Sequence, residues 1–300
     1  MNVDHFMVFL RNKRIAIAAN DAGGANQLYC LLKNSSVPVA KSLLDGPAQT
    51  IFRDLIPAAK TYNRLVPSFF DGIDLLLSAT SWSSNLEHLA RREAKRSGVF
   101  SVSILDHWVN YRQRFSFSGE QVFPDELIVV DDYAKKIAVG EFPGMPVHQV
   151  PDFYLQSILD GVGRSKDGAI LYVLEPARSD WGLGIPGEFQ ALEFFLSNYH
   201  LLRFTAGARV LLRAHPSDPP GKYDFIRMKH PEIIIEPDVE SIQSSMSKAQ
   251  WVIGCNTYAM VIGCGAGRNV LCSLPPWAPR CVLPHQGIRY LSDLIVGKEE

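Results

Sequence analysis

The sequence is poor in cysteine and has no cysteine pair spaced for a metal site. The number of cysteines, five, is odd, no Cys-x-x-Cys motif occurs, and most of them have apolar neighbours. Disulfide frameworks and structural zinc sites depend on paired cysteines. The sequence therefore predicts free thiols in a reducing compartment. The cysteines are Cys30, Cys255, Cys264, Cys272 and Cys281.

An excess of charge of one sign and a long apolar run are also missing. Thirty basic and 31 acidic residues leave the 300-residue chain with a net charge of −1, so no overall field favours nucleic acid or an anionic membrane. No segment reaches the roughly 20 apolar residues that span a bilayer. Residues 1–14 hold too short an apolar run for a signal peptide. We expect a cytoplasmic protein with no nucleic-acid partner, and peripheral association with the inner face of the plasma membrane stays open.

Apolar segments of strand length alternate with amphipathic segments along the chain. This alternation is typical of parallel sheets with helices on both faces. It runs through the first half, reaches a linker-like stretch at 151–167 and starts again. We predict an α/β fold of two Rossmann-like doubly wound domains that face a cleft, at 1–155 and 156–300. Strands are expected at 14–20, 74–80, 99–105, 126–132, 168–176, 208–216, 232–237, 251–255 and 268–273, and a long helix at 187–204.

Ligands bind beyond the carboxyl ends of the strands in such sheets, and the first loop of this kind contains Asp21, Gly23 and Gly24. The glycines allow close backbone approach, and the following helix offers free N–H groups to a ligand. Asp21 suits a general base that takes a proton from a hydroxyl. An N-cap aspartate with turn glycines is the structural alternative. This loop has no Gly-x-Gly-x-x-Gly fingerprint, so we expect no dinucleotide there.

The second loop, 105–115, combines charged, polar and aromatic side chains at a strand end. This mixture suits an acceptor pocket in which a ring stacks on the face of a sugar. Asp106 and His107 are further candidates for the base, and the sequence does not rank them against Asp21. A surface loop with one buried tryptophan is the structural alternative. The acceptor-binding candidates in this loop are Trp108, Asn110, Tyr111 and Arg112, beside Gly23 and Gly24 of the first loop.

The third loop begins with Arg213, His215 and Pro216, where an apolar strand stops. Proline after histidine keeps His215 out of the helical region of backbone space, so its ring is expected to point off the end of the sheet. An imidazole there, cationic or hydrogen-bonding, can hold a phosphate or protonate a departing phosphate oxygen. A structural histidine is the alternative.

The fourth loop holds Asn256 and Thr257, between the strand at 251–255 and an apolar helix. One of them is expected to cap that helix, and the free N–H groups with the hydroxyl form a seat for an anion. Plain capping uses the same geometry, so both roles are compatible.

A run of four basic residues lies on a predicted helix. It is typical of a solvated helix face, and contact with anionic lipid or with another protein is the alternative. The run consists of Arg91, Arg92, Lys95 and Arg96.

The order of these motifs resembles that of the GT-B-fold glycosyltransferases. "RAHP" at 213–216 and "GCNTYAM" at 254–260 are similar to the His-Pro and serine/threonine motifs of bacterial sialyltransferases and Kdo transferases, which use CMP-sugars. CDP-glycerol-dependent teichoic-acid polymerases are similar at the same places. The resemblance implies that these motifs bind the nucleotide phosphate and that an acidic residue of the N-terminal domain is the base. The nucleotide- and phosphate-binding candidates are then Arg213, His215, Pro216, Glu175, Asn256, Thr257 and Tyr258, and the catalytic candidates are Asp21, His215, Asp106 and His107.

The resemblance implies an inverting glycosyltransferase of bacterial surface polysaccharide biosynthesis. It would move a nonulosonic acid or Kdo-type sugar from a CMP-activated donor to a glycan or lipid-linked glycan acceptor. No acidic residue lies between Glu240 and Asp293, where UDP- and ADP-sugar enzymes of this fold hold the ribose with a carboxylate, and this favours CMP. No Asp-x-Asp triplet occurs, so we expect catalysis without a metal ion or other cofactor.

Two departures from the family pattern concern the donor. An Asn-Thr pair replaces a serine pair, and Asp21-Ala-Gly-Gly stands where some sialyltransferases have an acidic motif. Two alternatives therefore remain open. One is a UDP-sugar epimerase or hydrolase of the UDP-GlcNAc 2-epimerase type, and the other is a non-catalytic nucleotide- or glycan-binding partner in a polysaccharide-assembly complex.

Overall fold

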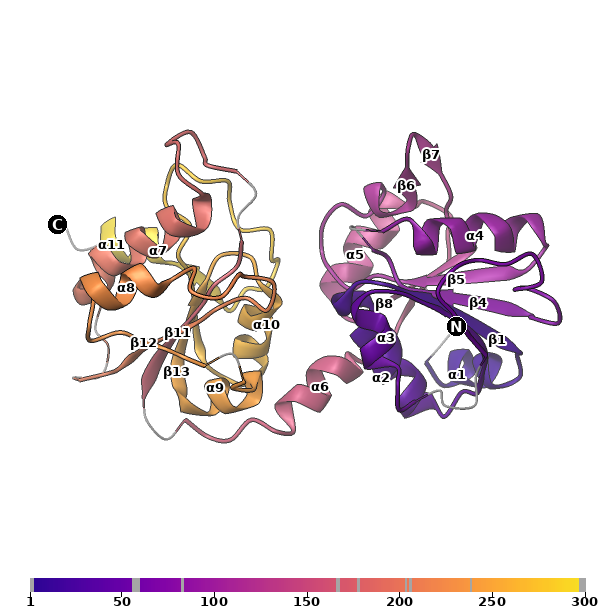
Figure 1. Cartoon of the computed structure of the whole chain (residues 1–300), viewed down its shortest axis with the longest axis horizontal. Helices are drawn as coiled ribbons and strands as arrows, with labels where there is room; N and C mark the ends of the chain where they lie inside the picture. The colour runs from indigo at the N-terminus through magenta and orange to yellow at the C-terminus, as the bar shows by residue number, and fades with distance from the viewer. Residues whose placement is uncertain are drawn as a thin grey trace. The chain divides into compact units, whose positions relative to one another are not determined.

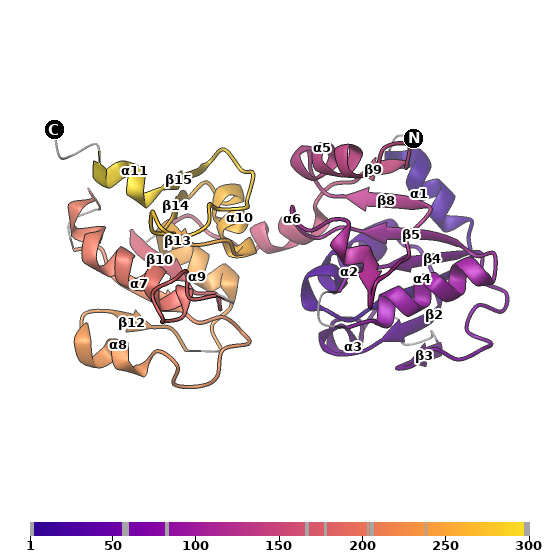
Figure 2. The same cartoon turned by 90° about the horizontal axis from the view of Figure 1, so that it is seen from above.

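The computed structural model describes residues 3–55, 60–81, 84–165, 168–176, 179–202, 204, 207–237 and 239–296. The chain divides into two compact units, Met1–Tyr154 and Leu155–Glu300. Each unit contains one parallel sheet with helices packed against it (Figures 1 and 2). Within these described ranges, no helix combines the length and the apolar character that crossing a bilayer requires.

The N-terminal unit is built on a seven-stranded sheet of order β3-β2-β1-β4-β5-β8-β9, and every pairing in it is parallel. The chain runs outward from β1 toward β3 and then returns to add the other strands on the far side. The direction changes between β1 and β4, and this switch point is where ligands bind in doubly wound sheets. The strands are β1 (Ile15–Ala19), β2 (Val39–Leu44), β3 (Lys60–Tyr62), β4 (Leu75–Ser78), β5 (Phe100–Ile104), β8 (Glu126–Val129) and β9 (Val147–Gln149).

Successive residues of β1 face two different cores, because side chains along a strand alternate between the faces of a sheet. Ile15 and Ile17 pack with α1, α2 and α3, whereas Ala16 and Ala18 pack with α4, and Figure 1 shows these helices on opposite sides of the sheet. Burial on both faces explains why β1 is a continuous apolar run. The helices are α1 (Val3–Arg11), α2 (Ala22–Ser35), α3 (Pro47–Ile51), α4 (Leu86–Arg96) and α5 (Asp132–Glu141), and a 3-10 turn, η1 (Gln113–Phe115), precedes the hairpin β6 (Ser116–Phe117) and β7 (Glu120–Gln121).

The C-terminal unit repeats this plan with a six-stranded parallel sheet of order β12-β11-β10-β13-β14-β15. Its first strand, β10, again lies inside the sheet, so the switch point falls between β10 and β13. The strands are β10 (Ala169–Val173), β11 (Val210–Arg213), β12 (Ile234–Ile235), β13 (Ala249–Gly254), β14 (Asn269–Cys272) and β15 (Ile288–Tyr290).

Helices cover both faces of this second sheet as well. Residues of α7, α8 and α11 share one core with Ile170 and Tyr172 of β10, and Figure 1 shows α9 and α10 on the other side. The predicted α/β class with two doubly wound parallel sheets is therefore confirmed. The helices are α7 (Gly187–Asn198), the 3-10 turn η2 (Tyr199–Leu201), α8 (Asp224–Lys229), α9 (Ile242–Lys248), α10 (Tyr258–Gly265) and α11 (Leu291–Val296).

The stretch expected to be a linker, 151–167, contains a helix, α6 (Phe153–Leu159). Its glycines and charged residues suggested an extended connection. These residues are concentrated after Leu159, however, and the segment before them is apolar enough to bury Ile158, which is 3% exposed.

Candidate functional site

In the N-terminal unit, three adjacent strands bring polar residues to one edge of the sheet. Asp21 follows β1, Thr80 follows β4 and Asp106 follows β5, and these strands are neighbours in parallel order. Parallel strands end at the same edge, so these side chains gather around the switch point between β1 and β4. The structure therefore groups Asp106 with the first loop.

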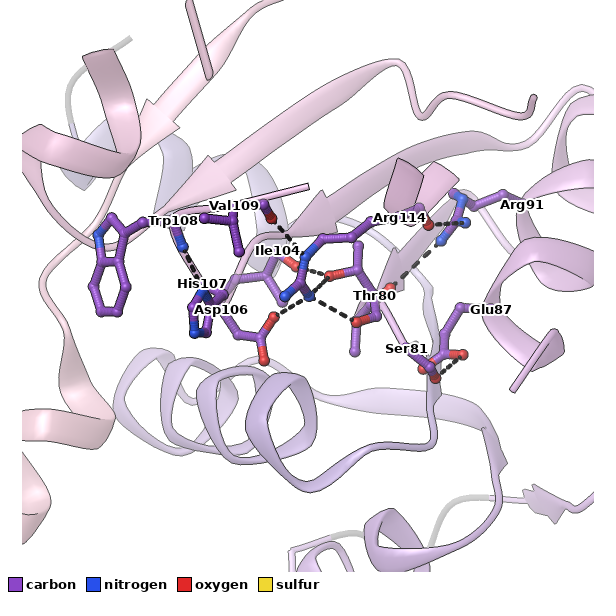
Figure 3. A network of polar contacts seen from close by, with 11 residues as sticks. Thr80, Ser81, Glu87, Arg91, Ile104, Asp106, His107, Trp108, Val109 and Arg114 are labelled. Atoms are coloured by element: carbon purple, nitrogen blue, oxygen red, sulfur yellow. Dashed lines mark hydrogen bonds and ion pairs between the residues drawn. The ribbon is translucent and has the colours of Figure 1, made fainter. Parts of the chain in front are cut away.

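An ion pair organises this edge. Figure 3 shows the Asp106 carboxylate and the Arg114 guanidinium pointing toward each other, with 2.7 Å between Oδ1 and Nη1. The same Nη1 donates to the carbonyl oxygen and the hydroxyl of Thr80, each at 3.2 Å. Both charged side chains are largely buried, at 14% and 11% exposed. Charged partners in such surroundings hold each other in a fixed geometry, so Asp106 is committed to Arg114.

His107 is held in one tautomer. Its Nδ1 accepts a hydrogen bond from the Trp108 backbone N–H at 3.0 Å, so the proton of the neutral ring lies on Nε2. Partial burial lowers the pKa of His107, and Arg114 adds to this effect while Asp106 opposes it. A neutral ring with Nε2–H meets a ligand as a hydrogen-bond donor. His107 is therefore the least suitable of the three candidates for a base.

The two glycines of the first loop allow helix α2 to lie close to the strand ends. A Cβ atom on Gly23 would lie 2.3 Å from Asp106 Oδ2, and one on Gly24 would lie 2.8 Å from Ala79 Cβ. Gly24 is buried, so its role is close packing of the helix rather than contact with an acceptor. Asp21 is the N-cap residue of α2, and its carboxylate accepts a hydrogen bond from Asn20 Nδ2 at 2.8 Å.

The aromatic residues of the 105–115 loop do not form the stacking surface that the sequence suggested. Trp108 and Tyr111 are 3% and 2% exposed, and Trp108 Nε1 donates to Asp131 Oδ2 at 2.9 Å. Arg112 pairs instead with Glu141 at 3.3 Å. Asn110 is exposed in a left-handed turn with φ of 59°. The loop is thus a structural support for Asp106, His107 and Arg114, with two buried rings as its base.

The basic run on α4 is not a uniformly solvated face. Arg92 and Arg96 are 46% and 74% exposed, but Arg91 is only 1% exposed. Burial lowers the pKa of Arg91 to about 10, and the nearby Glu87 opposes this shift. Glu87 is buried as well, which raises the pKa of its carboxyl. The prediction for Arg91 was wrong, because helical spacing alone does not show which residue of a basic run faces the sheet.

In the C-terminal unit, three adjacent strand ends again carry the candidate residues. His215 follows β11, Glu175 follows β10 and Thr257 follows β13. The order β11-β10-β13 places all three on the carboxyl edge of one sheet, with Glu175 on the central strand. The phosphate-binding candidates thus share this edge, at the switch point of the second sheet.

His215 is also fixed in one tautomer, by its own loop. Its Nδ1 accepts from the Ser217 backbone N–H at 3.2 Å and contacts Ser217 Oγ at 2.7 Å. Its backbone N–H donates to Asp218 Oδ2 at 2.9 Å. Partial burial lowers the pKa of His215. The charge of Lys222 lowers this pKa further, whereas the carboxylate of Asp218 raises it. Of the two forms expected from the sequence, the geometry favours a neutral ring with Nε2–H as donor.

His215, Arg213 and Pro216 line one pocket of about 200 Å³ at the ends of β11 and β12. Arg213 Nη1 donates to Ser245 Oγ at 3.0 Å and lies 3.7 Å from the buried carboxylate of Glu236. Ser217 and Glu236 were not predicted as site residues. The signal for Ser217 was its place directly after the His-Pro pair, where its N–H can reach the ring.

Glu175 joins the ends of β10 and β13. Its Oε1 accepts from the Asn256 backbone N–H at 2.6 Å. Burial raises the pKa of Glu175 to about 7, and this hydrogen bond opposes the rise. A carboxylate would repel a phosphate, so Glu175 is better suited to holding the loop before α10 than to binding the anion itself.

Thr257 is the residue that caps α10. Its Oγ1 accepts from the Ala259 N–H at 3.3 Å, whereas the side chain of Asn256 accepts from the Val282 N–H at 2.8 Å. Tyr258 is the first residue of the helix. The capped N-terminus offers N–H groups to an anion. The Asn256 side chain connects the loop before α10 to the segment around Val282.

A cluster of thiols lies behind this loop. Cys272 and Cys281 both donate to the carbonyl oxygen of Cys255, at 3.6 and 3.3 Å, and all five cysteines of the chain are free. Interaction with the Cys272 thiol lowers the pKa of Cys281. Across the described part of the chain, no group of three or more His, Cys, Asp or Glu side chains is placed to hold a metal ion.

A Gly-x-Gly-x-x-Gly stretch does occur, at 182–187, and begins nine residues beyond the end of β10. Its third glycine opens α7, and a Cβ there would lie 2.6 Å from the ring of Trp181. The glycine thus accommodates a tryptophan ring. In a dinucleotide fingerprint it would instead serve close packing of the helix on the strand.

No protein-family model matches this sequence, and no curated protein sequence is significantly similar to it. Solved structures are similar in fold. A Listeria monocytogenes protein proposed to be a UDP-N-acetylglucosamine 2-epimerase matches with a TM-score of 0.57 and 11% identity, over 86% of this chain and 79% of that one. MnaA from S. aureus, solved with UDP, gives 0.56 and 12%, over 86% and 78%.

A third similar structure is the α/β-galactoside α-2,3-sialyltransferase of the luminous marine bacterium Photobacterium phosphoreum. It matches with a TM-score of 0.54 and 10% identity, over 94% of this chain and 100% of that one. This chain has the same fold. At such identities the likeness shows the arrangement of strands and helices and leaves the reaction to be argued from the site.

Proposed function

We propose that this protein is an inverting glycosyltransferase that uses a CMP-activated sugar of the nonulosonic acid or Kdo type. The acceptor would be a glycan or a lipid-linked glycan of bacterial surface polysaccharide biosynthesis. Peripheral association with the inner face of the plasma membrane, in the cytoplasm, would bring the enzyme to a lipid-linked acceptor.

The observation that carries this proposal is the shared edge of His215 and Thr257. His215 and the capped N-terminus of α10 follow the strands on either side of β10. In the proposed complex, the imidazole Nε2–H and the N–H groups of α10 would donate to the oxygens of one phosphate. Charge grows on that phosphate as the bond to the sugar breaks. N–H groups that are fixed in place before the reaction stabilise this growing charge more than they stabilise the bound nucleotide sugar.

Asp21 is the proposed base. His107 offers a proton donor at Nε2, and Asp106 is committed to Arg114, so Asp21 is the carboxylate of this edge best suited to accept a proton from the acceptor hydroxyl. The acceptor oxygen would attack the anomeric carbon while the bond to the phosphate breaks, and CMP would leave. Attack from the opposite face gives inversion.

The donor class and the absence of a metal rest on the sequence. The stretch between Glu240 and Asp293 has no carboxylate to hold a ribose, which favours CMP over UDP and ADP. The chain has no Asp-x-Asp triplet, and the N–H donors of His215 and α10 can carry the leaving phosphate without a cation.

A thermal-shift screen of CMP, CDP, UDP, GDP and ADP tests the donor class. A ligand that binds the folded state raises the unfolding temperature by mass action, and we expect the largest rise with CMP. A rise with none of the five would overturn the proposal. Binding of CMP with no transfer to any glycan would instead support a non-catalytic nucleotide-binding partner.

A UDP-sugar epimerase or hydrolase is the second candidate. It is favoured by the likeness to MnaA solved with UDP and to the Listeria protein. Incubation with UDP-GlcNAc followed by product analysis separates the two functions. An epimerised or hydrolysed sugar would assign the chain to this candidate, whereas unchanged UDP-GlcNAc together with a CMP response would favour transfer.

A further inference from the structure

A second pocket, of about 210 Å³, lies beside the Asp106–Arg114 ion pair in the N-terminal unit. Its walls come from Ser81 and Ser84, which follow β4, and from α4, η1 and β6. Arg114 belongs to both places, because it pairs with Asp106 and also lines the pocket. A ligand in this pocket would therefore lie next to the ion pair of Asp106 and Arg114.

The charges in the floor of this pocket are balanced. Glu87 and Arg91 line it and are each 1% exposed, and they lie one helical turn apart on α4. Arg114, the second cation, is paired with Asp106. The two cations of the lining, Arg91 and Arg114, are thus matched in number by two carboxylates, those of Glu87 and Asp106. The balance leaves no net charge to attract an anion, so the pocket favours a neutral polar ligand.

Arg91 retains hydrogen-bonding capacity. Its Nε donates to Val122 O at 3.1 Å, but the contacts of its terminal nitrogens with Ser78 Oγ, Ala79 O and Arg114 O are each 3.5 Å, near the limit of a hydrogen bond. A buried guanidinium with long contacts is costly unless something else accepts from it. A ligand oxygen in the pocket would do so.

His88 supplies a second buried group with an unused atom. Its Nε2 lies 3.3 Å from Glu120 Oε2, whereas its Nδ1 is buried and has no hydrogen-bond partner among the described residues. Its side chain is 5% exposed. The ring of Phe117 lies 5.8 Å from that of His88 and is 42% exposed at the pocket.

We propose that this pocket binds one neutral sugar ring of the acceptor. Hydroxyl groups of a sugar both donate and accept hydrogen bonds, as a lining of carboxylate, guanidinium, imidazole and serine hydroxyls requires. The C–H face of the sugar would pack on Phe117. That this sugar belongs to the acceptor rests on the proposed transfer reaction. The binding of a neutral sugar in the pocket does not depend on that reaction.

Saturation-transfer NMR on the whole chain tests this proposal. The probes are methyl glycosides of neutral hexoses and of N-acetylhexosamines, without nucleotide. We expect a saturation-transfer signal for at least one of these sugars. A Phe117→Ala variant should bind that sugar roughly 3- to 10-fold more weakly. Phe100→Ala is the matched control, because Phe100 is 37% exposed on β5 of the same unit and should leave binding unchanged.

Three results would overturn the proposal. The first is the absence of a saturation-transfer signal for every neutral sugar, and the second is an equal loss of sugar affinity in the two phenylalanine variants. The third is loss of the sugar signal when acetate or phosphate is added, which would show an anion site. The proposed function fails separately. If sugar binding depends on Phe117 but no nucleotide stabilises the protein, the pocket is supported and the transferase is rejected. If CMP stabilises the protein but no neutral sugar binds, only the pocket is rejected.

Discussion

Glu175 is a largely buried carboxyl group whose protonation changes near neutral pH. Burial raises its pKa from the usual 4.5 to about 7, and its Oε1 still accepts from the Asn256 N–H. Between these two values the folded state holds a proton that the unfolded state has lost. The stability contributed by this group is therefore present at low pH and is lost as the pH rises to about 7.

We predict that the free energy of unfolding falls relative to that of a Glu175→Gln variant as the pH rises from about 5 to about 8. The full change is at most roughly 3 kcal/mol, since each pH unit is worth about 1.4 kcal/mol. Urea denaturation of both proteins at several pH values measures the difference, in which other titrating groups cancel. A difference that stays constant over this range would contradict the raised pKa.

At the residue scale, the sequence predicted positions better than roles. It placed His215 and Thr257 at strand ends, because a strand that stops before a proline or a helix cap leaves a local pattern. It could not show that Arg91 is buried or that Ser217 fixes the His215 tautomer. Both facts depend on which atoms fold against each other, and the pattern of residue types does not encode that.

Close packing of helix α2 on the strand ends is the first feature at the element scale. A Gly24→Ala substitution would place a methyl group 2.8 Å from Ala79 Cβ, so we expect a loss of about 1–3 kcal/mol in stability. Gly140→Ala is the matched control, because Gly140 is helical and a Cβ there meets nothing within 4 Å.

The control substitution should stabilise the protein by up to about 1 kcal/mol, since alanine is the better helix former. Thermal unfolding of the two variants measures both effects. Equal unfolding temperatures would mean that α2 tolerates displacement and that the glycine pair serves another purpose.

The N-cap of α10 is the second element-scale feature, and α9 provides its control. Ser241 Oγ accepts from Ser244 N at 3.1 Å as Thr257 Oγ1 accepts from Ala259 N at 3.3 Å. Thr257→Ala and Ser241→Ala should each lower stability by about 0.5–2 kcal/mol. Only Thr257→Ala should also weaken CMP binding, as measured by calorimetric titration. Equal CMP affinity of the two variants would remove α10 from the site.

Element prediction worked where a run is mainly apolar and failed where charged residues interrupt it. β1 and β10 contain only apolar residues and lie within the strands predicted at 14–20 and 168–176. β2 contains Lys41 and Ser42, and β15 contains Arg289. Lys41 can lie in a strand because its Nζ reaches the carbonyl oxygens of Ser68 and Asp71, a contact over about thirty residues that no local window detects.

At the scale of the whole molecule, the repetition of the strand-helix pattern was enough to predict two doubly wound units. The switch point of each sheet then followed from strand order, which the sequence did not give directly. Both switch points carry the residues that strand-end reasoning selected: Asp21 and Asp106 in the first unit, and His215, Glu175 and Thr257 in the second. The prediction that the rings of the 105–115 loop form an exposed stacking surface was wrong, because loop composition does not show which side chains are buried.

His215 is the proposed ligand of the phosphate of a CMP-linked donor at the switch point of the second sheet. Calorimetric titration with CMP and with cytidine isolates this role, because the two ligands differ only in the phosphate. We expect CMP to bind more tightly than cytidine. His215→Ala should reduce this advantage by roughly 10- to 150-fold, as expected for one hydrogen bond to a charged group. Cytidine affinity should not change. Equal affinities of the two ligands, or an equal loss of both in the variant, would contradict this role.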